Sequence, residues 1–250
     1  MSDPSYVVVL DFDGACTRKS AGSLFKIMDE SGGLTPECLQ KARDLRKYYF
    51  AKAHDAKLKL NEKDTYDWFS KTIDLYIESG LTMAKIRSAM SRVQLRSGLK
   101  DCLRLLQDRD IQVAIVSYGV HQFIEEALRA NQVLHLVSEI YAAKLVIRGT
   151  GLVTGFYPDT AVFPHNKGGF SRIFAKKHGV PLHRILAVGD SGGDAELGHL
   201  KENRLGLAAD NKEKKTLRQY MGEVIVAESF VPAQFWLLRK IDSVGADCGR

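Results

Sequence analysis

The sequence has few cysteines, and they follow neither a metal-binding nor a disulfide pattern. Its 250 residues include four, Cys16, Cys38, Cys102 and Cys248, and no two of them form a C-x-x-C pair. Structural zinc sites need clustered Cys and His ligands, and disulfide-rich secreted domains need regularly spaced cysteines. The scattered positions argue against both classes, so we expect reduced and mostly buried thiols.

Long apolar runs are also missing. The sequence contains no stretch of about eighteen consecutive apolar residues, although a membrane-spanning helix needs about twenty. The segment Met1 to Pro4 lacks the charged and apolar regions of a secretory signal. The chain of 250 residues is long enough to bury a substantial core, and 45% of its residues are hydrophobic. We therefore expect a cytoplasmic globular protein with no membrane partner.

Charge of one sign does not dominate the chain. The formal net charge is +6, with 36 Lys and Arg residues interleaved with 30 Asp and Glu residues. The most basic stretch runs from Lys41 to Lys63 and holds eight basic against three acidic residues. It is interpreted either as a solvated helix face or as a surface that attracts an anionic, phosphorylated substrate. A nucleic-acid polymer is the least favoured partner because no recognised nucleic-acid motif accompanies the charge.

The chain is organised around a β-branched run that ends in two carboxylates and a glycine. Residues Val7 to Leu10 are followed by Asp11, Phe12, Asp13 and Gly14. Such a run is typical of a central parallel strand, and the strand period of two places Asp11 and Asp13 on the same side. Buried paired carboxylates indicate a bound cation or acid–base chemistry. The alternative is a simple Asp-Gly turn preceded by a helix-capping Asp.

Strands and helices alternate along most of the remaining chain, which shows no internal repeat or low-complexity linker. The pattern predicts strands at 111–116, 185–188, 205–208 and 224–227 and a β-hairpin within 137–157, with helices near 99–109, 122–130, 167–178, 195–200 and 234–241. This alternation predicts an α/β fold, a doubly wound and mainly parallel sheet.

The segment between Thr35 and about Arg96 departs from this alternation, because it contains helical patterns and no convincing strand. Thr35 and Pro36 suit the N-cap and first position of a helix. A second helix is expected after Asn61, where Tyr66, Phe69, Ile73 and Ile77 recur at helical spacing. We expect residues 18–96 to form an α-helical cap inserted into an α/β core made of residues 1–17 and 97–250.

Polar side chains follow three separate predicted strands. Asp11 and Asp13 follow the first, Ser117 follows the second, and Asp190 and Asp194 follow the strand at 185–188. Lys167 begins a predicted helix at the corresponding place in the repeating pattern. Since ligands of doubly wound sheets bind at the carboxyl ends of the strands, these side chains are expected to share one site.

Carboxylates, a lysine and a hydroxyl are the groups needed for phosphoryl transfer with a hard cation. Asp11, Asp190 and a backbone carbonyl suffice to hold Mg²⁺ beside a substrate phosphate. Ser117 and nearby backbone N–H groups can hold phosphate oxygens while Lys167 neutralises charge. One aspartate can act as a nucleophile that forms an acyl phosphate, and Asp13 can protonate the leaving oxygen.

The same residues resemble the four motifs of haloacid dehalogenase (HAD) superfamily phosphatases. Asp11-Phe12-Asp13-Gly14 is similar to the first motif, Ser117 to the second, Lys167 to the third and Gly189 to Asp194 to the fourth. The resemblance implies a HAD-like, Rossmannoid core with Asp11 as nucleophile and Asp13 as general acid/base and magnesium ligand through its backbone carbonyl. It also implies phosphate binding by Ser117, Tyr118, Gly119 and Lys167, metal binding by Asp190, and support of the metal or of Lys167 by Asp194. Ala15 stands where the family usually has Thr, and Thr17 follows later.

The helical insertion resembles the cap of the phosphoserine phosphatase and pyrimidine 5′-nucleotidase branches. The features that are similar to the nucleotidase branch are Tyr48-Tyr49, Glu62-Lys63, Trp68, Gly80, Leu95 to Gly98 and Ser191 to Asp194. The implied activity is magnesium-dependent hydrolysis of a small phosphorylated metabolite through an aspartyl phosphate, with a nucleoside 5′-monophosphate as the candidate substrate. The alternatives are a phosphoserine-type phosphatase, a phosphomutase and, least favoured, a non-enzymatic HAD-like binding module. The candidate substrate-selecting residues of the cap are Lys47, Tyr49 and Trp68.

Overall fold

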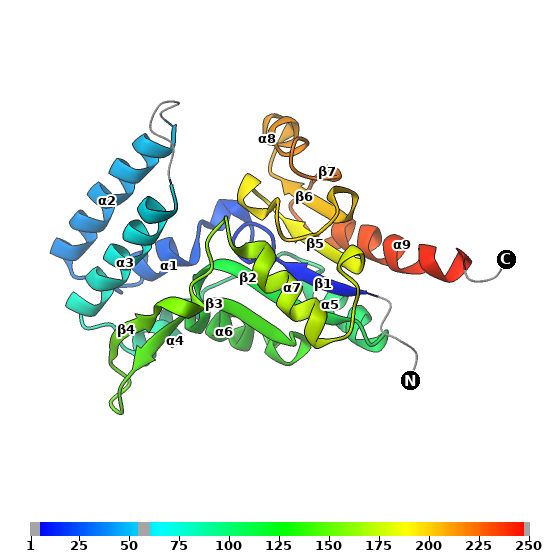
Figure 1. Ribbon diagram of the computed structural model, residues 1–250. Helices are drawn as coiled ribbons and strands as arrows, with labels where there is room; N and C mark the ends of the chain where they lie inside the picture. The colour runs from blue at the N-terminus through cyan, green and yellow to red at the C-terminus, as the bar shows by residue number, and fades with distance from the viewer. Residues whose placement is uncertain (1–5, 55–60, 248–250) are drawn as a thin grey trace.

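A single β-sheet forms the centre of the computed structural model, which describes residues 6–54 and 61–247. Within these residues the sheet has seven strands in the order β4-β3-β2-β1-β5-β6-β7 (Figure 1). The strands are β1 (Val7–Leu10), β2 (Gln112–Val120), β3 (Glu139–Ile147), β4 (Val153–Tyr157), β5 (Ile185–Gly189), β6 (Arg204–Ala208) and β7 (Glu223–Val226). All neighbours are parallel except β3 and β4, which form the antiparallel hairpin expected from the sequence.

The first strand lies in the middle of the sheet, as its apolar composition predicts. In β1, Leu10 pairs with Ile115 of β2 on one side and with Val188 of β5 on the other. Its side chains alternate between the two faces, so that Val8 and Leu10 join one hydrophobic cluster while Val7 and Val9 join another. Both faces of the strand are therefore buried.

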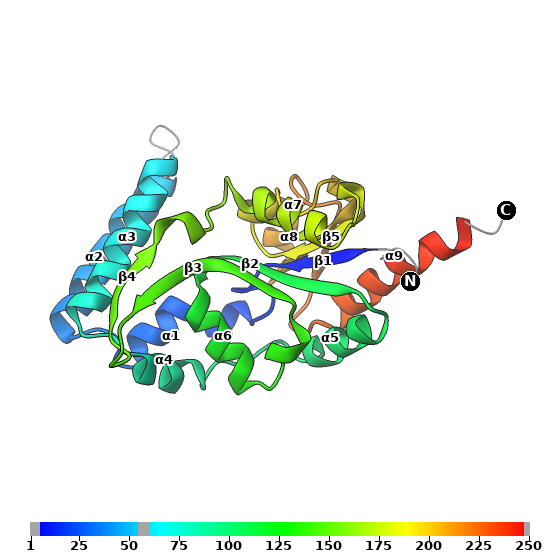
Figure 2. The ribbon, with the colours of Figure 1, turned by 60° about the horizontal axis from the view of Figure 1, so that its bottom comes forward.

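Helices cover both faces of the sheet (Figure 2). The smaller cluster packs under α7 (Lys167–Lys177), and α8 (Asn211–Leu217) covers β6 and β7 on the same side. The larger cluster packs under α5 (Leu99–Asp108), α6 (His121–Ala130) and α9 (Val231–Asp247). This is a mainly parallel, doubly wound α/β sheet, as the alternating pattern predicts.

The inserted segment is helical. It contains α1 (Leu24–Glu30), α2 (Pro36–His54), α3 (Glu62–Glu78) and α4 (Met83–Met90). Thr35 caps α2 by accepting a hydrogen bond from the Cys38 N–H, and Asn61 starts α3 with a reciprocal capping box. Helices α2 and α3 stand side by side at one end of the sheet, whereas α4 packs against the core helix α6 (Figures 1 and 2).

One local expectation was wrong, and one helix was not predicted. Residues 195–200 form turns instead of an α-helix, between short 3-10 helices at Gly192–Asp194 and Lys201–Asn203. Gly198 is packed so closely that a Cβ there would lie 2.9 Å from the Arg204 side chain, which bonds the Gly198 carbonyl. Helix α8 was missed because its polar sequence carries almost no apolar periodicity. The remaining 3-10 helices are Lys19–Ala21, Leu134–Leu136, Pro158–Thr160 and Leu182–Arg184.

Cys16, Cys38 and Cys102 are buried free thiols, and Cys248 lies outside the described residues. Among the described helices, none combines the length and the apolar character needed to cross a membrane.

Candidate active site

The acids that follow β1 and β5 meet at one edge of the sheet. Asp11 directly follows β1 and Asp190 directly follows β5, and these strands are neighbours. The Asp11 N–H donates to the Val188 carbonyl at 2.9 Å, which extends the ladder to the acid. Oxygen atoms of Asp11, Asp190 and Asp194 all lie within 4.8 Å of one another, and all three residues are buried. The parallel register therefore produces the three-carboxylate cluster.

Two glycines make this close approach possible. Gly14 adopts a φ of +81°, and a Cβ at this position would lie 2.1 Å from Oδ2 of Asp190. A Cβ at Gly189 would lie 2.4 Å from the Asp194 Cβ. A side chain at either position would force the acids apart, so the glycines of the two motifs are needed for the cluster geometry.

Lys167 is buried between two of the carboxylates. Its Nζ lies 2.7 Å from Asp11 Oδ1 and 2.6 Å from Asp194 Oδ1. The other oxygen of Asp194 accepts hydrogen bonds from the backbone N–H groups of Asp190 and Ser191 and from the Ser191 hydroxyl, at 2.9–3.0 Å. Both oxygens of Asp194 are thus used to hold Lys167 and the loop after β5.

Burial and crowding shift the protonation of this cluster. Burial raises the pKa of Asp11 well above its ordinary range, although the Lys167 ammonium opposes the shift. Burial, followed by the charge of Asp194, raises the pKa of Asp190 to about 6. Burial alone would lower the pKa of Lys167, but Asp11 and Asp194 outweigh it and raise that pKa. Lys19 adds a second ammonium, 3.0 Å from Asp190 Oδ2. Two ammonium groups do not balance three buried carboxylates, and the all-oxygen donor set fits a hard divalent cation.

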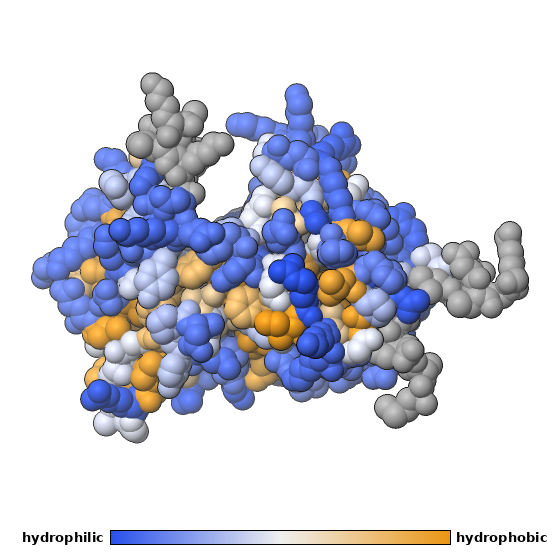
Figure 3. All heavy atoms as spheres, in the orientation of Figure 1, coloured by the Kyte–Doolittle hydropathy of each residue, from blue (hydrophilic) through white to orange (hydrophobic). Residues whose placement is uncertain are grey.

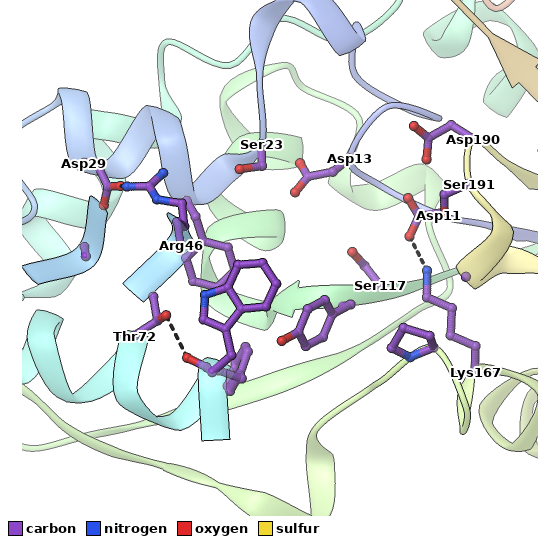
Figure 4. A pocket seen from close by; sticks show the side chains of 17 residues that line it. Asp11, Asp13, Ser23, Asp29, Arg46, Thr72, Ser117, Lys167, Asp190 and Ser191 are labelled. Atoms are coloured by element: carbon purple, nitrogen blue, oxygen red, sulfur yellow. Dashed lines mark hydrogen bonds and ion pairs between the residues drawn. The ribbon is translucent and has the colours of Figure 1, made fainter. Parts of the chain in front are cut away.

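Asp13 lies on the cavity wall beside Asp11 (Figure 4). Its carboxyl oxygens accept the Leu24 N–H, at 3.2 and 3.3 Å, at the first turn of α1. Burial raises the pKa of Asp13 to about 7, against the effect of this hydrogen bond. Asp13 is therefore suited to hold and exchange a proton near neutral pH.

Ser117 faces the same cavity from β2, as expected for the second motif. It is 3% exposed and lines the cavity together with Tyr118. The pairing of β2 with β3 shifts register between Val116 and Val120, where the strand passes the site. Gly119 is buried in this irregular stretch and, unlike Ser117 and Tyr118, does not line the cavity. The strand also continues three residues beyond the predicted Ser117 turn.

The cavity extends from the acids to the helical insertion and has a volume of about 310 Å³. Three helices each contribute two residues that are four positions apart and therefore lie on the same face of their helix. These pairs are Phe25 and Asp29 from α1, Ala42 and Arg46 from α2, and Trp68 and Thr72 from α3. Phe69 adds a further ring. Figure 3 shows apolar surface between the lobe formed by α2 and α3 and the lobe that carries α8.

The three candidate residues of the cap have different positions. Trp68 lines the cavity. Tyr49 does not line it but is buried against Trp68, with the rings stacked at a centroid distance of 5.4 Å and an interplanar angle of 11°. Lys47 is off the cavity, because one residue along α2 turns the side chain by about 100°. Its neighbour Arg46 lines the cavity instead.

The basic stretch from Lys41 to Lys63 is partly neutralised by ion pairs. Lys41 pairs with Glu37 and Glu78 on the outer surface, and Lys52 pairs with Asp64 at 2.6 Å. Lys57 and Lys59 lie outside the described residues. The interpretation as a solvated helix face applies to Lys41, whereas the Lys52–Asp64 pair is only 21% and 15% exposed. Arg46 lines the cavity and pairs with Asp29.

Sequence reasoning missed Asp29 and Arg46 and assigned no role to Arg96. Arg96 is 3% exposed, and its guanidinium donates to the carbonyls of Gly14, Thr17 and Ala227. The backbone N–H of Arg96 donates to the Cys16 carbonyl oxygen at 2.8 Å. The Thr17 hydroxyl accepts the Gly14 N–H at 3.0 Å, which gives this loop a threonine contact despite Ala15. Arg96 thus fixes the loop that carries Asp13.

We predict that Arg96→Met lowers the free energy of unfolding by about 3–5 kcal/mol, because several buried carbonyls lose their donor. Chemical denaturation measures the change. Arg92→Met is the matched control, since Arg92 is exposed on the same segment, and should change stability by less than about 0.5 kcal/mol. Equal stability of the two variants would contradict a clamping role for Arg96.

Comparison with known proteins adds to this geometry. A sequence model described as "Pyrimidine 5'-nucleotidase (UMPH-1)" matches residues 13–226. The 7-methylguanosine phosphate-specific 5'-nucleotidase A of Xenopus laevis is 26% identical over 198 residues, which are 75% of this chain and 68% of that protein. The crystal structure of cytosolic 5'-nucleotidase IIIB bound to cytidine superposes with a TM-score of 0.77 at 21% identity, covering 96% of this chain and 87% of the other. A phospho-aspartyl intermediate analogue of phosphoserine phosphatase gives 0.63 at 18% identity, covering 93% and 98%. The two structural matches establish the HAD-like fold.

Proposed function

Since the chain belongs to the pyrimidine 5′-nucleotidase (UMPH-1) family of the HAD superfamily, we propose that it hydrolyses nucleoside 5′-monophosphates with Mg²⁺ as cofactor. Membership makes it a phosphoric monoester hydrolase, as the motif residues predict. The observation that carries the proposal is a continuous cavity in which Asp11, Lys167 and Asp190 occupy one end and aromatic rings of the helical insertion occupy the other. The acids suit a phosphate, and the rings suit a planar base.

The metal would be held by the carboxylates of Asp11 and Asp190 and by the backbone carbonyl of Asp13. When bound, Mg²⁺ supplies positive charge that stabilises the transferring phosphoryl group. Asp194 acts as a positioning residue, because its oxygens already hold Lys167 and the loop after β5. Its four hydrogen bonds favour this role over direct coordination.

Asp11 is the proposed nucleophile. Oδ1 is held by Lys167, whereas Oδ2 has no hydrogen-bond partner among residues 6–54 and 61–247. Attack by Oδ2 forms an Asp11–phosphorus bond and breaks the bond from phosphorus to the ester oxygen of the nucleoside. Asp13 donates its proton to that leaving oxygen. In the second step, Asp13 takes a proton from a water molecule that attacks the aspartyl phosphate, and this restores free Asp11 and releases inorganic phosphate.

The phosphate oxygens are assigned to donors around the cluster. Lys167 and the Ser117 hydroxyl lie on the cavity wall with Asp11, and the backbone N–H groups of Tyr118 and Gly119 follow along β2. These groups stabilise the charge that develops on the phosphoryl oxygens.

Substrate selection is assigned to residues 18–96, and chemistry to residues 1–17 and 97–250. Tyr118 connects the two parts, because its hydroxyl donates to the Thr65 carbonyl of α3 at 3.1 Å. Trp68 provides a ring for the base and Tyr49 supports that ring from behind, whereas Lys47 takes no part.

Metal removal and a substrate panel test the proposal. We expect the wild-type enzyme to hydrolyse nucleoside 5′-monophosphates with a higher kcat/KM than O-phosphoserine or p-nitrophenyl phosphate. Treatment with EDTA should abolish release of inorganic phosphate, and excess MgCl₂ should restore it. A preference for O-phosphoserine, or full activity in EDTA, would overturn the proposal.

A further inference from the structure

We propose that Arg46 is a specificity-determining residue that selects nucleobases carrying a ring carbonyl oxygen, as in uracil, cytosine and guanine, over adenine. The inference rests on the proposed nucleotidase function and concerns the cap end of the same cavity. Figure 4 shows Arg46 and Asp29 at the end opposite the Asp11–Lys167 pair, with Thr72 close by.

Arg46 is held in a fixed position by a buried carboxylate. Its Nη2 pairs with Asp29 Oδ2, and the Asp29 side chain is only 6% exposed. The other oxygen of Asp29 accepts the Tyr76 hydroxyl at 2.6 Å, and that hydroxyl also lies 3.2 Å from the Phe25 carbonyl. Each carboxylate oxygen therefore has a donor within the fold, and this buried carboxylate orients Arg46.

Arg46 retains hydrogen-bond donors that the fold does not use. Its Nε and Nη1 have no hydrogen-bond partner within residues 6–54 and 61–247, and the side chain is 31% exposed where it borders the cavity. A guanidinium donates and never accepts, and a bond from a charged donor to a carbonyl oxygen is stronger than a neutral one. An acceptor on a ligand that fills this end can therefore receive a hydrogen bond from Arg46.

Thr72 supplies the complementary group. Its hydroxyl donates to the Trp68 carbonyl at 2.8 Å, so toward the cavity it can act only as an acceptor. Phe25, Trp68 and Phe69 make the adjoining walls apolar and planar. An N–H next to a ring carbonyl, as in uracil and guanine, matches this donor–acceptor pair. Adenine places an amino group, a donor, where guanine has its carbonyl oxygen.

The test measures kcat/KM for UMP, CMP, GMP, AMP and p-nitrophenyl phosphate with wild type and variants. Arg46→Met should lower kcat/KM about ten- to a hundredfold for the best carbonyl-bearing nucleotide, mainly by raising KM, because one charge-assisted hydrogen bond is lost. AMP and p-nitrophenyl phosphate should change less than about twofold.

Arg46→Met leaves Asp29 without its cation, so two further variants protect the test against misfolding. Arg46→Lys keeps a charge beside Asp29 but lacks the planar donors, and Asp29→Asn/Arg46→Met removes both charges together. Both should lose the same preference while keeping hydrolysis of p-nitrophenyl phosphate. Lys47→Met, one position along α2 and off the cavity, is the matched control and should behave as wild type.

The outcomes separate the two levels of the proposal. Equal losses for AMP and the carbonyl-bearing nucleotides, or no loss in the folded double variant, would overturn the role of Arg46 and leave the nucleotidase intact. Wild-type hydrolysis of p-nitrophenyl phosphate without hydrolysis of any nucleotide would overturn the proposed function itself, and the inference with it.

Discussion

Asp11→Asn is expected to abolish turnover, to below a few per cent of wild type, while the protein remains folded. An amide has no nucleophilic carboxylate oxygen and so does not form the acyl phosphate. The fold should survive, because Lys167 keeps its 2.6 Å contact with Asp194 and the removed charge lies in a cluster of buried acids. Steady-state phosphate release with a nucleoside monophosphate and with p-nitrophenyl phosphate measures the loss.

Acid quenching during turnover of a ³²P-labelled nucleotide supplies an independent readout. Wild type should retain protein-bound label that hydroxylamine removes, as expected for an acyl phosphate, and Asp11→Asn should retain none. Asp101→Asn is the matched control, because the Asp101 side chain is 73% exposed on α5 and does not line the cavity. Turnover above a few per cent, or label on the variant, would show that another group is the nucleophile.

The parts of the site that follow strand ends could be predicted from the sequence because topology decides them. Asp11, Ser117 and Asp190 lie at or beyond the expected strand ends on β1, β2 and β5, which are adjacent in the sheet. Parallel neighbours bring their carboxyl ends to one edge, so apolar runs followed by polar residues were sufficient evidence. Lys167 was predictable in the same way, because the helix that it starts packs on one face of the sheet and brings Lys167 to this edge.

The cap end of the cavity depends on helix rotation and packing, which local patterns do not specify. Arg46 and Lys47 are both basic residues of α2, yet only Arg46 lies on the face shared with Ala42. Asp29 looked like an ordinary polar residue at the end of α1, and its role follows only from contacts with Arg46 and Tyr76, which are 17 and 47 positions away. The role of Arg96 likewise depends on partners as distant as Ala227.

Lys167→Ala is expected to lower kcat/KM by about a hundredfold or more, through loss of a preorganised cation beside the transferring phosphoryl group. Lys167 is almost fully buried, with its side chain 5% exposed, and it contacts Asp11 and Asp194 simultaneously. Its removal therefore takes away charge stabilisation and also the contact that fixes Asp11 Oδ1. Steady-state kinetics at saturating Mg²⁺, together with inhibition by inorganic phosphate, measures both effects, and phosphate should inhibit the variant more weakly.

A loss of stability has to be separated from a loss of catalysis in this variant, because replacing Lys167 leaves buried carboxylates without their ammonium. Melting temperatures with and without Mg²⁺ make the separation, since a divalent cation bound to the acids compensates for part of the missing charge and should raise the melting temperature of the variant more than that of wild type. Lys176→Ala, at an exposed position of the same helix, is the control for helix content and should match wild type in both assays. If Lys167→Ala lost only thermal stability and kept its kcat/KM at a temperature where it is folded, Lys167 would be a structural residue at the start of α7, and phosphate binding would have to be assigned to Ser117 and the backbone N–H groups of β2.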